Sequence, residues 1–291
     1  GRTVAPAQLR RAGADLLHST SSLFIHCPRG MKHVVTLHDL SISRHPERFR
    51  RWQINAWHRR LPVITGADRV ICISRFTADE AISLLGLAAK KIEVVHNGCD
   101  WHDDQIAFAE TPPAWPVPGE FFLCVGSLEP GKNLRLLREV WRRAEDEGCR
   151  LPPLLLVGSR RDGVPEEGRH PSGWHSLGHQ PDGVLLHLYR RALALVFPSI
   201  YEGFGLPVIE AMAQGCPVVC SRLSSLPEVT GDAALLGAPD ATWYLSALRE
   251  VATQADLRAD LARRGRANAQ RFKWSRCAFE TAAVYRTTAP A

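Results

Sequence analysis

The sequence lacks several features that would each indicate a class of protein. No apolar run approaches the ~18 residues of a membrane-spanning helix, and the N-terminal stretch GRTVAPAQLR has no apolar core of a signal peptide. The eight cysteines form no CxxC pair, and His18, His26, His33 and His45 show no metal-ligand spacing. These absences argue against a membrane-spanning protein, a disulfide framework and a zinc site. We therefore expect a cytoplasmic protein that has no metal site and no cofactor.

The composition that remains is that of an ordinary globular protein. The chain has 291 residues, of which 45% are hydrophobic and 23% charged, and this length suggests about two domains. The formal net charge of +6 suits an anionic ligand or an anionic surface. Because no nucleic-acid-binding motif accompanies this charge, we expect no nucleic-acid partner.

Short apolar runs alternate with amphipathic stretches along the whole chain. This rhythm is typical of an α/β fold with doubly wound parallel sheets. A proline cluster at Pro112, Pro113, Pro116 and Pro118 cannot continue a helix or a strand, so 111–120 is predicted to be a linker. The sequence thus predicts an N-terminal domain over 1–110 and a C-terminal domain over 121–291 that includes the C-terminal helices. We count about four strands before the linker and about six after it, so the first domain is expected to lack its opening strands.

The stretch PSIYEGFGLPVIEAMAQGC (198–216) places two acids around a turn. It follows the apolar run LALVFPS, which predicts a buried strand, and Pro207 and Gly215 suit the start and the end of a helix. Glu202 would then lie on the loop at the carboxyl end of the strand, where open α/β sheets bind ligands, and Glu210 on the helix. Acids beside the unpaired amides of 204–206 suit a polyhydroxyl ligand with a phosphate. The alternative is a solvated loop acid and an acid that stabilises the first helical turn.

A second stretch, FFLCVGSLEPGKNL (121–134), predicts a strand, a short loop and a helix. Gly126 would allow a close backbone approach and Lys132 would supply a positive charge, which together suit a phosphate. The stretch is not a Walker loop, because Asn133 stands where Ser or Thr would be needed. A glycine that ends one element beside a solvated lysine is the alternative.

Two further features have mainly structural interpretations. Ser225 and Glu228 have the spacing of a capping box and predict the start of a short helix. In 44–60, helical spacing places Ile54, Trp57 and Leu61 on one face and Phe49 and Trp52 on the other, among Arg48, Arg59 and Arg60. This exposed aromatic pair predicts docking on an anionic membrane, at the inner face of the plasma membrane. A solvated basic face, or a surface covered by a segment before residue 1, is the alternative.

Taken together, the motifs resemble the family 4 retaining glycosyltransferases of the GT-B fold, in particular their bacterial mannosyltransferase-like branch. The resemblance covers nearly the whole chain, in the family's order, and the block from Glu202 to Glu210 is its most specific part. It runs through TLHD (36–39), ISRFT (73–77), VVHNGCD (94–100), VGSLEPGKNL (125–134), FPSIYEGFGLPVIEAMAQGCPVV (197–219) and SSLPEVTGDAALL (224–236). Two Rossmann-like domains facing across a cleft are the fold that this resemblance implies.

The resemblance also implies the roles of individual residues toward a nucleotide-sugar donor, which is a substrate and not a cofactor. Lys132 would hold the diphosphate, Glu202 the donor sugar and Glu210 the ribose. His38 would lie beside the donor sugar and the acceptor, as a catalytic residue together with Lys132 and Glu202. The donor-binding set is completed by Gly126, Ser127, Asn133, Gly203, Phe204, Gly205 and Leu206, and the cleft residues would be Asp39, Ser74 and Asn97.

The expected activity is transfer of a hexose, chiefly mannose from GDP-mannose, to a glycan or lipid-linked acceptor in cell-surface polysaccharide synthesis. No DxD motif is present, as the family's metal-independent chemistry would have it. The chain departs from the family in carrying Gly131 where an arginine commonly precedes the lysine, and the family's glycine-rich first loop would fall before residue 1. The alternatives are an inactive sugar-nucleotide-binding subunit and a GT-B epimerase or hydrolase acting on sugar nucleotides.

Overall fold

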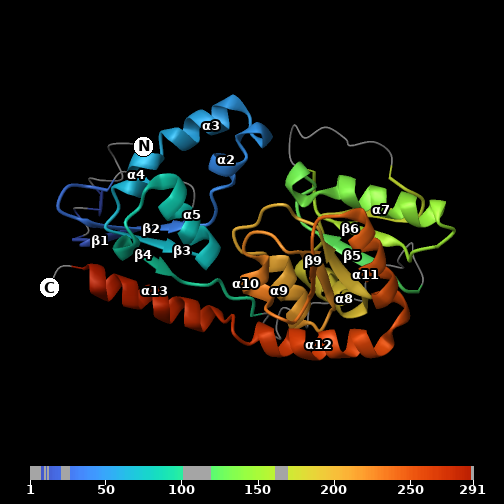
Figure 1. The fold of residues 1–291 in the computed structure, drawn as a ribbon. Helices are drawn as coiled ribbons and strands as arrows, with labels where there is room; N and C mark the ends of the chain where they lie inside the picture. The colour runs from blue at the N-terminus through green and yellow to red at the C-terminus, as the bar shows by residue number, and fades with distance from the viewer. Residues whose placement is uncertain are drawn as a thin grey trace. The chain divides into compact units, whose positions relative to one another are not determined.

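The fold is taken from a computed structural model that describes residues 8, 9, 11, 13–20, 27–100, 119–160 and 170–289. The chain divides into two compact units, and each contains a parallel sheet with helices on its faces (Figure 1). Unit 1 comprises Gly1–Gly98 and Lys273–Ala291, and unit 2 comprises Cys99–Phe272. Most of the predicted linker, 111–118, lies outside the described residues. None of the helices in the described ranges combines the length and the apolarity needed to cross a membrane.

Unit 1 is built on a sheet of four parallel strands in the order β1-β2-β3-β4, which is the number that the sequence predicts for this part. The first pair, β1 (Leu16–Ser19) and β2 (Lys32–Leu37), is joined by β3 (Arg69–Cys72) and β4 (Ile92–Val94). Parallel strands buried on both faces read as continuous apolar runs, and the residues of VVTL and VIC show this pattern.

One face of this sheet packs on helices that lie between β2 and β4 in the chain. Alternate strand residues Val35 and Val70 share a buried cluster with Trp57 and Ile64, because successive side chains of a strand point to opposite faces. The elements of this region are α2 (Ser41–Arg44), η1 (Pro46–Arg48), α3 (Arg51–His58), α4 (Leu61–Thr65), α5 (Arg75–Leu85) and η2 (Ala89–Lys91).

The other face of the same sheet is covered by the last helix, α13 (Trp274–Thr288). Val284 of α13 joins Val34 and Ile71 in a buried cluster, and the His18 ring of β1 is hydrogen-bonded to the Tyr285 hydroxyl at 2.5 Å. The sequence had assigned all C-terminal helices to the second domain, but α13 packs on the sheet of unit 1. The apolar face of a helix shows that it packs on something, and its spacing does not say on which sheet.

The predicted amphipathic helix of 44–60 differs in detail from the structure. Helix α3 ends at His58 and α4 begins at Leu61, so the two are separate helices, and Pro62 lies at the start of the second. Trp57 is buried as predicted and Trp52 is 64% exposed. The prediction of an exposed aromatic pair is wrong, because Phe49 precedes the helix in extended backbone and is half-buried.

Unit 2 contains a sheet of six parallel strands in the order β10-β9-β8-β5-β6-β7, again the number that the sequence predicts. The chain runs outward from β5 to β7 and then returns to the other side of β5 to form β8, β9 and β10. Strands β5 and β8 are therefore neighbours whose connections leave in opposite directions, which defines a topological switch point. The bounds are β5 (Phe122–Val125), β6 (Leu154–Val157), β7 (Trp174–Gly178), β8 (Ala194–Phe197), β9 (Val218–Ser221) and β10 (Leu235–Gly237).

Helices cover both faces of this second sheet (Figure 1). On one face, Leu137 of α7 and Leu248 of α11 share the main buried cluster with Phe122 and Leu154 of the strands. Helix α9 packs against α12, and Gly265 of α12 lies close to Met212 of α9. The helical elements are η3 (Pro130–Lys132), α7 (Leu134–Asp146), α8 (Asp182–Arg191), α9 (Leu206–Ala213), α10 (Leu226–Thr230), α11 (Ala241–Thr253) and α12 (Ala255–Ala269).

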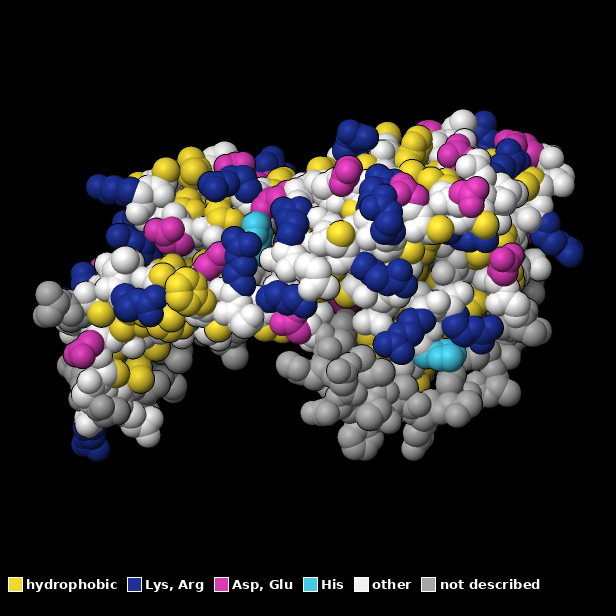
Figure 2. Space-filling model, turned by 90° about the horizontal axis from the view of Figure 1, so that it is seen from below, with side chains coloured by type: hydrophobic (Ala, Val, Ile, Leu, Met, Phe, Trp, Pro, Cys, Tyr) yellow, Lys and Arg dark blue, Asp and Glu magenta, His cyan; other side chains and the backbone are white. Residues whose placement is uncertain are grey.

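The surface of unit 2 distributes its charges. Figure 2 shows basic side chains spread over the side that carries α12, with acidic side chains between them. On α12 itself, Asp260 pairs with Arg263 at 2.6 Å and with Arg264 at 2.8 Å. Exposed ion pairs of this kind neutralise part of the basic charge, but each contributes only about 0–1 kcal/mol to the stability of the folded protein.

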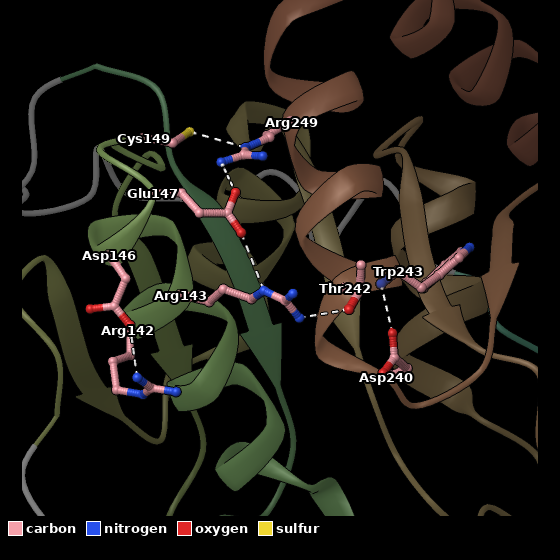
Figure 3. A network of polar contacts seen from close by, with 9 residues as sticks. All are labelled: Arg142, Arg143, Asp146, Glu147, Cys149, Asp240, Thr242, Trp243 and Arg249. Carbon is pink, nitrogen blue, oxygen red and sulfur yellow. Dashed lines mark hydrogen bonds and ion pairs between the residues drawn. The ribbon is translucent and has the colours of Figure 1, made fainter.

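A polar network fixes α7, the helix that follows the lysine loop, against α11 (Figure 3). Glu147 accepts hydrogen bonds from Arg143 at 3.2 Å and from Arg249 of α11 at 2.8 Å. Arg143 also donates to Thr242 at 2.6 Å, next to the helix start that Asp240 caps. These two arginines hold the pKa of the Glu147 carboxyl below its ordinary value. The C-terminal half of α7 is thus tied at several points, while its N-terminal end supports the loop described next.

Candidate functional site

The two sequence motifs of unit 2 meet at the carboxyl edge of the sheet, at the switch point. Strand β5 pairs with β8 through Phe122 and Ala194, so the loops that follow both strands are neighbours. The amide of Ile200 in the β8 loop donates to the carbonyl of Gly131 in the β5 loop at 3.0 Å. Ligands of open α/β sheets bind at this position, because the connections on the two sides diverge there.

Lys132 and Glu202 form an ion pair between these two loops. The Lys132 Nζ lies 2.5 Å from the Glu202 Oε1, and each side chain is only 14% exposed. The same Nζ lies 4.8 Å from the centroid of the Phe197 ring, at the end of β8. The interpretations of a solvated lysine and a solvated loop acid are therefore wrong. The Lys132 ammonium group thus lies against one carboxylate and one aromatic face, so an anionic ligand would compete with Glu202 for the lysine.

Two glycines are needed for the close approach of the strand ends. Gly126 has φ 143°, and a Cβ at this residue would lie 3.0 Å from the Cε of Lys132. Gly158, at the end of β6, has φ 138°, and a Cβ there would lie 1.9 Å from the carbonyl oxygen of Gly126. Sequence reasoning found Gly126 and missed Gly158, although both stand in the tripeptide VGS at the end of a strand. A side chain at Gly158 would require the backbone to shift, whereas one at Gly126 would strain its own backbone and displace the end of the Lys132 side chain.

The glycine-rich turn after Glu202 leads into the N-terminus of α9. Gly205 is the N-cap residue with φ 96°, and a Cβ there would lie 2.7 Å from Leu226 Cδ2. Within the described residues, the amides of Gly205 and Leu206 have no acceptor, as is usual for the first turn of a helix. Phe204 is buried against Phe272, and Gly203 is half-buried in the turn. Free amides and the positive end of the helix dipole favour an anion or an acceptor-rich ligand at this point.

Glu210 is the fifth residue of α9 and is also partnered. The hydroxyl of Tyr189, on α8, donates to the Glu210 Oε2 at 3.0 Å. Burial raises the pKa of Glu210, while the Tyr189 hydrogen bond lowers it and the nearby charge of Asp182 raises it. Sequence reasoning missed Tyr189, because a tyrosine within LLHLYRR looks like a core residue of a helix.

The loop after β9 holds the main chain of Glu202. The Glu202 amide donates to Ser224 Oγ at 2.9 Å, and the Ser225 hydroxyl donates to the Glu202 carbonyl at 2.9 Å. The short helix predicted at Ser225 is confirmed as α10, but the capping box at Ser225 and Glu228 is wrong, because the Ser225 side chain makes no capping hydrogen bond to α10. Its hydroxyl proton is used by the Glu202 carbonyl instead.

The other residues of the β5 loop occupy the same edge with less marked contacts. Ser127 is exposed after Gly126, and Asn133 is half-buried. Asn133 has the left-handed φ of 55° at the junction between η3 and α7. That backbone conformation is uncommon for a residue other than glycine and turns the chain directly after Lys132.

The residues predicted in the first domain follow three neighbouring strands of unit 1 at their carboxyl ends. His38 and Asp39 follow β2, and both are exposed. The His38 Nε2 is hydrogen-bonded to the Thr20 carbonyl at 2.8 Å. The Asp39 carboxylate accepts a hydrogen bond from the Ser41 amide at 2.8 Å. Asn97 is half-buried after β4. Ser74 has a structural role that sequence reasoning missed: it is fully buried and caps α5 by accepting from the Thr77 amide at 3.0 Å.

In the described part of the chain, no three His, Cys, Asp or Glu side chains are placed to hold a metal ion together. The chemistry that this site offers is therefore best stated from its protein groups. A cation, two carboxylates and a set of free amides converge on the carboxyl edge of the sheet in unit 2, which suits a ligand with both phosphate and hydroxyl groups.

Comparison with known proteins gives the family. The model described as "Glycosyltransferase Family 4" matches residues 2–102, and the model described as "Glycosyl transferases group 1" matches residues 119–254. The O-antigen chain mannosyltransferase B of Escherichia coli is 34% identical over 268 residues, which cover 87% of this chain and 70% of that protein. The chain belongs to glycosyltransferase family 4.

A second relative of this glycosyltransferase is longer than the chain. The serotype-specific mannosyltransferase WbdA of Escherichia coli is 26% identical over 269 residues, which cover 85% of this chain and 32% of that protein. The chain therefore spans about a third of the length of WbdA.

Solved structures show that the fold is GT-B. Sucrose-phosphate synthase from Thermosynechococcus elongatus superposes with a TM-score of 0.76 at 21% identity, covering 97% of this chain and 75% of that one. The Anabaena protein Alr3699/HepE, solved in complex with UDP-glucose, gives a TM-score of 0.73 at 19% identity, covering 97% of this chain and 81% of that one. The predicted fold class is confirmed.

The buried carboxylate of Glu210 gives a prediction about stability. Because its pKa is raised in the folded protein, the charged form costs stability at neutral pH, and this cost disappears as the pH falls through the raised pKa toward the ordinary value of 4.5. Glu210→Gln keeps an acceptor for Tyr189 and should raise the melting temperature at pH 7 by about 2 °C. Thermal unfolding from pH 4 to pH 8 measures this, and the exposed Glu139→Gln on α7 is the control. An equal or lower melting temperature at pH 7, or a gain that grows on acidification, would contradict the assignment.

Proposed function

We propose that this glycosyltransferase moves a hexose, specifically mannose from GDP-mannose, to a glycan or lipid-linked acceptor in the synthesis of a cell-surface polysaccharide. The observation that carries the proposal is the Lys132–Glu202 pair at the switch point of unit 2. The choice of mannose rests on two relatives, the O-antigen chain mannosyltransferase B and WbdA, which are both mannosyltransferases. Binding of a nucleotide sugar in this fold is supported by the UDP-glucose complex of Alr3699/HepE.

In this proposal the donor rearranges the ion pair. Its diphosphate takes Lys132 from Glu202 and is also bound by the free amides at the start of α9, because a diphosphate carries more charge than one carboxylate. Glu202 then accepts hydrogen bonds from hydroxyl groups of the donor sugar. Glu210, whose second oxygen is held by Tyr189, accepts from the ribose hydroxyl groups.

The proposed transfer retains the anomeric configuration and uses no metal. The bond between the anomeric carbon and the diphosphate oxygen breaks, an acceptor oxygen forms the new bond on the same face, and the acceptor proton passes to the leaving diphosphate. Glu210 is assigned to the ribose, so no second carboxylate remains for a glycosidase-like nucleophile. Lys132 and the amide dipoles stabilise the leaving charge. His38 stays the predicted residue beside the donor sugar and the acceptor.

A second candidate function is sugar-nucleotide binding without transfer. The observation that favours it is Gly131, a buried glycine whose carbonyl is bound to Ile200, at the position where the family commonly has an arginine. One positive charge toward the diphosphate is then missing. Release of nucleoside diphosphate from a panel of sugar nucleotides, measured with and without acceptor, separates the two candidates: release that depends on acceptor indicates transfer, and binding without release indicates the inactive subunit.

The pair itself gives the first prediction about activity. Lys132→Ala and Glu202→Ala should each lower kcat/KM for transfer by ~100-fold or more, because each removes a contact that strengthens as charge develops in the transition state. Steady-state rates with the active donor measure this, and circular dichroism checks the fold. The exposed residues Lys90 and Glu139 supply matched controls, Lys90→Ala and Glu139→Ala, which should keep wild-type rates. If the folded Lys132→Ala and Glu202→Ala variants keep near wild-type turnover, the reaction does not take place at this site.

We further propose that unit 1 docks on an anionic membrane surface through α3. The exposed residues of α3 are Arg51, Trp52, Asn55 and His58, and the exposed Arg59 follows directly as its C-cap. Residues 49–67 contain no Asp or Glu, so the face has no acid of its own segment to neutralise it. A tryptophan among arginines suits the headgroup region of anionic lipid, where each basic residue contributes about 1 kcal/mol. The acceptor that we propose would then be reached at the membrane.

Vesicle sedimentation tests this surface. The full chain should bind vesicles that contain phosphatidylglycerol more strongly than neutral vesicles, with binding that falls as salt rises. Trp52→Ala combined with Arg59→Glu should weaken it by about tenfold or more. The matched control is Phe279→Ala with Arg276→Glu on α13, which has a 69% exposed aromatic residue and covers the other face of the same sheet. Equal loss in both variants, or equal binding to both kinds of vesicle, would rule out docking through α3.

A further inference from the structure

Left-handed backbone outside glycine is rare in this chain. Among the described residues, only Asn133 (φ 55°) and Ser224 (φ 52°) combine a side chain with a positive φ. Both stand in loops at the carboxyl edge of the sheet in unit 2: Asn133 directly follows Lys132, and Ser224 contacts Glu202. Such strain persists only where other interactions compensate for it, and it gathers where geometry serves function.

Glycine would adopt the backbone conformation of Ser224 without strain, so the Ser224 side chain is explained by its contacts and not by the backbone. Its Oγ accepts the hydrogen bond of the Glu202 amide at 2.9 Å. Next to it, the fully buried Ser225 donates to the Glu202 carbonyl at 2.9 Å. Both polar groups of the Glu202 main chain are therefore held by consecutive serines, and the left-handed turn at Ser224 lets two neighbouring hydroxyl groups reach the same residue.

A third serine extends this arrangement toward the strand. The Ser221 hydroxyl at the end of β9 donates to the carbonyl of Ser199, three residues before Glu202, and both serines are fully buried. The loop that carries Glu202 is thus attached to the β9 side at two points. Its other side is attached to the lysine loop through the bond between Ile200 and Gly131. Between these attachments, the Glu202 carboxylate lies against Lys132.

We propose that Ser224 is a positioning residue that holds Glu202 in the orientation required to contact the donor sugar. This inference rests on the proposed function, in which Glu202 meets the sugar and Lys132 the diphosphate. It assigns to Ser224 an effect on the sugar part of the donor alone. The nucleoside diphosphate is bound by Lys132, Glu210 and the amides of α9, none of which Ser224 contacts.

Two substitutions at Ser224 separate the hydroxyl from the backbone. Ser224→Gly and Ser224→Ala both remove the acceptor for Glu202, but only glycine adopts the left-handed conformation without strain. The glycine variant should therefore melt about 2–4 °C above the alanine variant, while both lose kcat by about tenfold or more. The value of kcat would then depend on the Ser224 hydroxyl, and the melting temperature would depend on the strain of the backbone at this residue. Ser246→Ala, an exposed serine on α11, is the control and should change neither quantity.

The decisive readout is the preference for the sugar, measured by calorimetry on the full chain with GDP-mannose and with GDP. The wild type should bind GDP-mannose more tightly than GDP, and both Ser224 variants should lose this preference while their affinity for GDP stays within about twofold. UDP-glucose and UDP serve as a second pair. A glycine variant that keeps both the preference and wild-type kcat would overturn the inference, because Ser224 would then serve only the backbone.

Hydrogen exchange of the Glu202 amide gives a readout that needs no ligand. Loss of its acceptor should speed exchange by about tenfold in both Ser224 variants and leave it unchanged in Ser246→Ala. If the wild type binds no sugar nucleotide, the proposed function fails, and this exchange rate then tests separately whether Ser224 holds the Glu202 main chain. Unchanged exchange in the glycine variant would then refute the hydrogen bond on which it depends.

Discussion

The ion pair between Lys132 and Glu202 is the interaction on which the organisation of the candidate site depends. Two charges that are each only 14% exposed need each other or a ligand, because an unpaired buried charge costs several kcal/mol. The strand order brings their loops together, the glycines at the ends of β5 and β6 allow the close approach, and the serines after β9 orient the acid. In the proposed function the donor diphosphate opens this pair, because it offers the lysine more negative charge than the carboxylate does.

The cost of building this site is visible in the backbone and in the charges. The two left-handed residues with side chains lie beside the pair, and the Glu210 carboxyl has a raised pKa because it is buried. Both features lower stability locally, and the large apolar cluster under α7 and α11 compensates for them. Residues at functional sites commonly lower stability in this way.

Much of the fold and of the candidate site could be predicted from the sequence, and what could not be has physical reasons. Apolar runs and turn residues predict about six strands after the linker, which is the number in the sheet of unit 2. The motifs around Lys132 and Glu202 predict which loops carry the polar groups. The sheet that α13 packs on could not be predicted, because the apolar face of a helix does not indicate which of two sheets it will cover. Tyr189 and Ser224 also escaped prediction, because their roles arise from contacts between residues 21 and 22 positions apart. The capping box predicted at Ser225 was wrong, because a serine hydroxyl has several possible hydrogen-bond partners and the sequence spacing considers only one of them.

The affinity for GDP in two matched variants tests most directly whether the donor diphosphate replaces Glu202 as the partner of Lys132. Glu202→Gln removes the competing charge and frees the lysine, so GDP should bind about tenfold more tightly than to the wild type, whereas Lys132→Gln should weaken binding by about tenfold or more. Opposite signs in calorimetric titrations at one ionic strength are the expected result. Weaker binding in both variants, or no change in either, would contradict the interpretation that a donor diphosphate replaces Glu202 at Lys132.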